Sequence, residues 1–190
     1  MLCQERSWYR VLDWLRGEPP IAPCIDLILK VNEAAMRVFV DTEFTDFIDC
    51  NLISIALVAD DGQEFYAECA DIDRHVCSAF VQEAVLPQLG QYPDCVFSRQ
   101  DLQLALREWL RPFKGGVFCM DFSGDWDLLV DILDGVPSGW QGLLVRDQAD
   151  QVRLESYYKL YGGRHHALHD ARALRYAMQD GTSATHSSSD

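Results

Sequence analysis

Residues 37–44, which read RVFVDTEF, constrain the fold of this chain more than any other segment. The apolar run Val38–Val40 is typical of a buried strand. Two carboxylates, Asp41 and Glu43, follow that run at once. Burying one ionised carboxylate costs several kcal/mol, and two close together repel each other, so a bound cation is the simplest reason for such a pair. The segment therefore predicts a buried strand that leads directly into a cation site.

Composition limits the class of protein. The chain has 190 residues, of which 48% are hydrophobic and 24% charged, as expected of one globular domain with a sizeable core. No apolar stretch approaches the ~20 residues that a membrane span requires, so no membrane partner is expected. Seven irregularly spaced cysteines without a C-x-x-C pair indicate a reducing, cytoplasmic setting. A net charge of -14 argues against a broad basic surface for duplex DNA, but it is compatible with a metal-bearing pocket that accepts a short single-stranded end.

The chain is interpreted as one functional domain over residues 36–180 with two flanking segments. Residues 1–35 are interrupted by Gly17, Pro19, Pro20 and Pro23, and Met36 directly precedes the first strong strand. We therefore expect 1–35 to be an N-terminal extension, and whether it belongs to the protein stays open. The Ser/Thr-rich residues 181–190 are expected to be a disordered tail.

The remaining pattern predicts a mixed sheet flanked by helices, an α/β layer architecture. Ser98, followed by Asp101, caps a helix with Leu102, Leu106, Trp109 and Leu110 on one face. Strands are expected over 37–41, 51–59, 63–69, 117–120 and 142–146, with a turn at Asp60-Asp61-Gly62; further helices are expected over 78–89, 126–133 and 170–179.

Further carboxylates occupy positions where loops converge. Asp125 follows the strand at 117–120 and opens a helix, and Asp170 opens the last helix beside three histidines. Side chains at strand ends and helix starts can meet in one pocket.

At these residues the chain resembles the DEDD superfamily of 3′–5′ exonucleases, in the subgroup whose third motif carries histidine (DEDDh). The resemblance covers roughly residues 36–180 and implies a ribonuclease-H-like fold. Asp41-Thr42-Glu43-Phe44 matches the first motif, residues 121–129 (DFSGDWDLL) resemble the second, Asn-x-x-Phe-Asp-x-x-x-Leu, and residues 165–171 (HHALHDA) match the third, His-x-Ala-Leu-x-Asp-Ala. Short chains that open with Asp-x-Glu-Phe are especially similar to small bacterial exoribonucleases.

The second motif departs from the family pattern. Asp121 stands where Asn is common, and Gly124 replaces the aromatic residue before the aspartate. Asp127 competes with Asp125 for the ligand role. Asp125 is favoured because residues 128–129 then supply the apolar helix positions of the family. The alternative for Asp125 is a plain helix N-cap.

The resemblance implies two Mg²⁺ or Mn²⁺ ions as cofactors, with Asp41, Glu43, Asp125 and Asp170 as ligands. Asp41 would bridge both ions, Glu43 and Asp170 would hold the ion that activates water, and Asp125 would support the second. Neutral His165 would take the proton from that water, because an imidazole titrates near working pH.

Two neighbouring histidines leave other interpretations open. His166 is one residue out of phase with the motif, and His169 adjoins Asp170. A zinc site built on the three histidines is an alternative, although their spacing is irregular and no cysteine flanks them.

The residues that would meet the substrate are less specific. By family likeness, the backbone at Thr42 and the ring of Phe44 contact the terminal nucleotide, the ring by stacking. The alternative places Phe44 in the core beside Phe47. Arg164 and Lys159 either contact phosphate or lie in a solvated loop, and Trp126 is expected to pack in the helix layer.

The sequence thus predicts an enzyme that removes nucleotides from single-stranded 3′ ends and releases 5′-monophosphates. RNA is the preferred polymer by resemblance, and a DNA-directed exonuclease is the alternative. A catalytically inactive relative that binds nucleic acid, and an unrelated acidic α/β protein with chance motifs, are the other readings. Many relatives dimerise, and the sequence leaves a homodimer open.

Overall fold

The computed structural model describes residues 35–179, so the expectations for the N-terminal extension and the tail lie outside the described residues, apart from residue 35. Six strands form one mixed sheet in the order β4-β3-β2-β1-β5-β6. β1 is antiparallel to β2 and parallel to β5. The strands are β1 (Arg37–Phe44), β2 (Leu52–Ala59), β3 (Glu64–Cys69), β4 (Val96–Phe97), β5 (Gly116–Met120) and β6 (Trp140–Leu144). This sheet confirms the predicted α/β class and is consistent with a ribonuclease-H-like fold.

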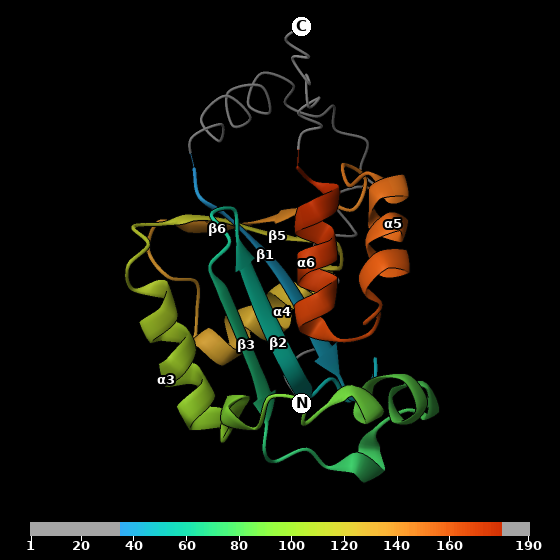
Figure 1. Cartoon of the computed structure of the whole chain (residues 1–190). Helices are drawn as coiled ribbons and strands as arrows, with labels where there is room; N and C mark the ends of the chain where they lie inside the picture. Colours follow the sequence, from blue (N-terminus) through green and yellow to red (C-terminus); the bar gives the residue numbers. More distant parts are fainter. Residues whose placement is uncertain (1–34, 180–190) are drawn as a thin grey trace, which may run out of the picture. The chain divides into compact units, whose positions relative to one another are not determined.

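Helices cover both faces of the sheet (Figure 1). On one face, leucines of α3 (Arg99–Leu110) and α4 (Ser123–Leu133) form the main core with Val38, Val40 and Phe118. On the other face, α6 (Ala167–Ala177) packs against β1 and β2, and α5 (Gln151–Tyr161) lies beside α6. The small side chains of Ala167 and Ala171 let α6 approach the strands closely.

Strand alternation in β1 places the first motif. Val38 and Val40 point into the α3–α4 core, so Asp41 and Glu43 point to the opposite face, toward α6. A bulge between Glu43 and Phe44 shifts the register against β2 and ends the regular pairing there. Bulges next to a site re-aim the side chains that follow.

Most predicted elements are confirmed with shifted ends, and three expectations are corrected. The strand expected over 142–146 is β6 at Trp140–Leu144, and the helix expected over 170–179 begins at Ala167 and ends at Ala177. The expected helix over 78–89 contains a π-helical segment, Val81–Val85, followed by a 3₁₀ turn. Pro87 explains this, because it has no N–H for the carbonyl four residues before it and its ring crowds that carbonyl. Helix α5 was not predicted.

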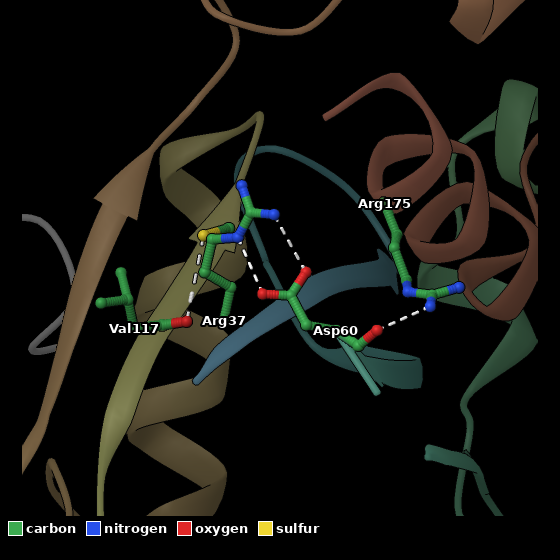
Figure 2. A network of polar contacts seen from close by, with 5 residues as sticks. Arg37, Asp60, Val117 and Arg175 are labelled. Carbon is green, nitrogen blue, oxygen red and sulfur yellow. Dashed lines mark hydrogen bonds and ion pairs between the residues drawn. The ribbon is translucent and has the colours of Figure 1, made fainter. Parts of the chain in front are cut away.

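A polar network ties α6 to the β2–β3 turn (Figure 2). The Arg37 guanidinium pairs with the Asp60 carboxylate, with Nε 2.8 Å from Oδ2. Arg175 of α6 donates to the Asp60 carbonyl oxygen at 2.7 Å. The network fixes the C-terminal half of α6 against the sheet, and α6 carries Asp170 at its other end. Within residues 35–179, no helix is long and apolar enough to cross a membrane.

Candidate metal centre

The site lies where β1 and β5 separate. The two strands pair in parallel from Arg37 to Phe39 on β1, and Phe39 lies opposite Cys119. Continued by two residues, this register would set Asp41 opposite Asp121, but the pairing stops before them. Their side chains therefore stand at the carboxyl ends of adjacent parallel strands, where functional groups gather in open α/β sheets.

Two groups of carboxylates meet at this point and share one residue. Asp41, Glu43 and Asp170 form the first group, and Asp41, Asp121 and Asp125 form the second. In each group the contributing oxygen atoms lie within 4.8 Å of one another. The structure thus brings together all four carboxylates that the sequence singled out, which come from β1, α4 and α6.

Asp125 is fixed by the strand that carries the first motif. It is 2% exposed, and its Oδ1 accepts from the Thr42 hydroxyl at 2.7 Å and from the Thr42 N–H at 3.2 Å. Its Oδ2 is buried without a hydrogen-bond partner. The N-cap of α4 is Phe122, so Asp125 does not cap the helix. Asp127 is exposed and belongs to neither carboxylate group.

Asp170 is held by two donors. Its Oδ1 accepts from the Tyr158 hydroxyl at 2.7 Å, and its Oδ2 accepts from the His165 N–H at 2.9 Å. His165 reaches that position with a φ of +66°, a conformation that non-glycine residues rarely adopt. Such strain persists only where the surroundings enforce it, as at functional sites.

Burial and like charge make the four carboxylates hard to ionise together. Burial, followed by repulsion from Asp170, raises the pKa of Asp41 well above its usual range. Burial likewise raises the pKa of Glu43 to about 8, that of Asp125 to about 7 and that of Asp170 to about 6. A divalent cation would relieve this repulsion, and carboxylate oxygens are the ligands that Mg²⁺ and Mn²⁺ prefer. The residues therefore fit such a cation.

His165 stands apart from the ligand set. Its ring lies edge-on against Phe80, with centroids 4.8 Å apart, and Gln88 donates to its carbonyl oxygen at 2.9 Å. Burial and the nearby Arg164 lower the pKa of His165. The imidazole is therefore neutral at pH 7 and able to accept a proton.

The other two histidines of the motif have different surroundings. His166 is 2% exposed and stacks on Tyr66, with centroids 4.8 Å apart. Burial lowers the pKa of His166 to about 4. Within residues 35–179, no group of three closely spaced ligand atoms includes a histidine, so the zinc alternative has no geometric support there.

Three phenylalanine rings lie beside the carboxylates. Phe44 follows Glu43 and stacks on Phe122, which follows Asp121, with centroids 6.0 Å apart. Phe47 meets both rings edge-on at 5.2 and 6.1 Å and is 80% exposed. Phe44 also packs against the main core, as the alternative for this residue expected, and its stacking on a base stays a prediction.

Gly124 makes room for this aromatic cluster. A Cβ atom at Gly124 would lie 2.2 Å from the Phe122 ring, which therefore occupies the space above the glycine. At the position before Asp125, where the family pattern has an aromatic residue, this chain has a glycine. The ring of Phe122 takes up the space beside that glycine.

Two arginines lie near the carboxylates. Arg146 donates from Nε to the Asp121 carbonyl oxygen at 2.8 Å and lines a cavity of about 460 Å³ with Asp121 and Gln151. Arg164 lies exposed in the turn before α6, as the solvated-loop alternative expected, and it pairs there with Glu155 at 2.7 Å. Lys159 is exposed on α5 rather than in a loop, and Trp126 packs against the core as predicted.

Sequence reasoning missed two residues of the site. Asp121 was noted only as a departure from the family asparagine, and its position directly after the strand at 117–120 was the available signal. Tyr158 carried no signal, because α5 was not predicted.

Comparison with known proteins gives a partial match. No family model matches the chain. A protein named 3′-5′ exoribonuclease from Mycobacterium tuberculosis strain H37Rv is 42% identical to it over 78 residues, and so is a protein of the same description from strain CDC 1551. The match covers 40% of this chain and 46% of each relative, so it spans less than half of their length. It supports a nuclease relationship for that part of the chain.

Proposed function

We propose that this chain is a metal-dependent 3′–5′ exoribonuclease that hydrolyses single-stranded 3′ ends and releases 5′-monophosphates. The observation that carries the proposal is the pair of carboxylate groups that share Asp41. Two adjoining carboxylate groups of this kind could hold a pair of neighbouring cations. The name of the mycobacterial relatives adds independent support for the reaction class.

The residues of the site would have two roles, cation binding and proton transfer. Asp41 lies between the two ligand groups, Glu43 and Asp170 complete one, and Asp125 with Asp121 completes the other. When bound, two Mg²⁺ or Mn²⁺ ions supply an activated water and stabilise the charge on the attacking and leaving oxygens. His165, neutral and outside the ligand groups, would accept a proton from the attacking water.

The surroundings of the carboxylates favour a single-stranded substrate. An exposed ring such as Phe47 offers a face for stacking an unpaired base, and stacking tolerates every base. The Thr42 N–H and hydroxyl are both engaged by Asp125, so the contact of Thr42 with the terminal nucleotide remains a prediction. RNA is proposed over DNA because the relatives are named exoribonucleases.

The test is hydrolysis of matched single-stranded RNA and DNA, labelled at the 5′ end, with Mg²⁺ or Mn²⁺. We expect stepwise shortening from the 3′ end, with 5′-monophosphates as products and RNA cleaved faster. Asp41→Asn should abolish the products, which separates this activity from a contaminating nuclease. Faster cleavage of DNA would support the exodeoxyribonuclease alternative. Tight binding without products would support an inactive binding relative and contradict the proposal.

The contribution of the exposed ring can be tested separately. Phe47→Ala should raise KM for single strands about tenfold, because one stacked base contributes about 1–3 kcal/mol. Thermal stability should change little, since the ring is 80% exposed. An unchanged KM would show that Phe47 does not contact the substrate.

A further inference from the structure

Tyr158 joins helix α5 to the candidate metal centre. It lies in the C-terminal half of α5, and its hydroxyl donates to Asp170 Oδ1 at 2.7 Å. The second oxygen of Asp170 accepts the His165 N–H at 2.9 Å. Each oxygen of this carboxylate is therefore held by one donor, and its plane is set by α5 on one side and by the loop before α6 on the other.

The Tyr158 ring is contacted in turn by an ion pair between Arg164 and Glu155. The Arg164 guanidinium lies over the ring, 4.0 Å from its centroid. Glu155, one turn earlier on α5, pairs with Arg164 at 2.7 Å. Cation–π and ionic contacts of this kind favour the observed orientation of the ring. The phenol hydroxyl is thus aimed at Asp170 before any ligand binds.

We propose that Tyr158 is a positioning residue that fixes the Asp170 carboxylate for cation binding, with Arg164 and Glu155 holding its ring. This inference rests on the proposed function and deepens it. Groups that orient a metal ligand through a hydrogen bond change metal affinity 10- to 100-fold when they are removed. Asp170 shares its group with Asp41 and Glu43, so a change in its orientation would alter one cation position directly.

The experiment measures Mn²⁺ binding by isothermal titration calorimetry on the full chain. Tyr158→Phe keeps the ring and removes only the hydroxyl. We expect its Mn²⁺ affinity to fall at least tenfold. The Mn²⁺ concentration that gives half-maximal hydrolysis should rise by a similar factor, and the rate at saturating Mn²⁺ should stay within a few-fold of wild type.

Two controls separate this role from a general effect on folding. Tyr161→Phe removes the hydroxyl of an exposed tyrosine near the end of the same helix and should bind Mn²⁺ like wild type. In an Asp170→Asn background, Tyr158→Phe should cause no further loss of affinity, because its effect acts through that carboxylate.

The possible outcomes distinguish the two proposals. Wild-type Mn²⁺ affinity in Tyr158→Phe overturns the positioning role and leaves the exonuclease proposal standing. An affinity loss that persists in the Asp170→Asn background also overturns it. Weakened Mn²⁺ binding in a protein that cleaves no nucleic acid supports the positioning role and contradicts the exonuclease. A wild-type chain that binds no Mn²⁺ overturns both.

Discussion

At the scale of single residues, Asp125 and Asp127 provide a matched pair. They lie two positions apart on α4, but Asp125 is buried with one unpartnered oxygen, whereas Asp127 is exposed. Asp125→Asn should abolish Mn²⁺-dependent activity while leaving the metal-free protein at least as stable as wild type at pH 8, because a buried charge is removed. Asp127→Asn should change unfolding free energy by less than about 0.5 kcal/mol. Hydrolysis rates and urea unfolding in chelator check both; equal losses of activity would contradict the assignment.

Variants of His165 and His166 should separate an effect on the reaction from an effect on stability. His165→Ala should lower kcat by about 10²- to 10⁴-fold with little change in Tm, because it removes the proposed proton acceptor. His166→Ala should instead destabilise the protein by about 1–3 kcal/mol, since it empties a buried position stacked on Tyr66. Its kcat per folded molecule should stay within a few-fold of wild type. Steady-state kinetics and thermal melts measure the two effects, and a similar loss of kcat in both variants would be against this division.

The residues of the site were predictable to different degrees. Asp41, Glu43, Asp125 and Asp170 stand beside recognisable strands and helices, so their convergence followed from the motif spacing. Their chemical roles stay predictions. Asp121 carried a weaker signal, its position directly after the strand at 117–120, and its place in the site depends also on where β1 and β5 stop pairing.

At the scale of elements, burial explains which helices were predictable. Helix α3 buries Leu102, Leu106 and Leu110 on one face, which gives a clear helical period. Helix α5 buries Tyr157 alone, because it packs beside α6 rather than on the sheet. Its apolar residues consequently follow no strong period, and the element went unpredicted.

Helix α5 also offers an element-scale test. Its N-cap Asp150 accepts from the Val152 and Arg153 N–H groups, as Ser98 of α3 accepts from Asp101. Asp150→Ala and Ser98→Ala should each lower the unfolding free energy by about 1 kcal/mol. Only Asp150→Ala should also weaken Mn²⁺ binding, because α5 carries Tyr158. Calorimetric titration measures the Mn²⁺ affinity of each variant, and urea unfolding measures its stability. Equal Mn²⁺ affinities in the two variants would show that the capping of α5 does not affect cation binding.

At the scale of the whole molecule, the buried carboxylates of the candidate site reduce the stability of the metal-free fold when they are ionised. The sheet and its two helix layers bring together carboxylates whose pKa values are raised to about 8 for Glu43 and about 7 for Asp125, chiefly by burial. In an unfolded chain such groups titrate near pH 4. The folded protein without metal therefore keeps protons that the unfolded chain has already released. Folding is favoured by this difference at low pH, and the contribution is lost as pH rises through the folded pKa values.

The free energy of unfolding in chelator should accordingly fall between pH 6.5 and 8.5, by on the order of 1–2 kcal/mol. This window avoids the opposite effect of His166, whose pKa is lowered to about 4, because the unfolded imidazole takes up a proton mainly below about pH 6.5. Saturating Mn²⁺ should restore stability at pH 8.5, since a bound cation favours the ionised carboxylates that the fold alone disfavours. Urea unfolding at both pH values measures the effect, and Asp125→Asn should reduce the pH dependence of the unfolding free energy in chelator, because one of the two carboxylates is removed. A wild-type slope of zero there would mean that these carboxylates ionise in the folded protein as they do in the unfolded chain, and the electrostatic reason for a cation at this site would be lost.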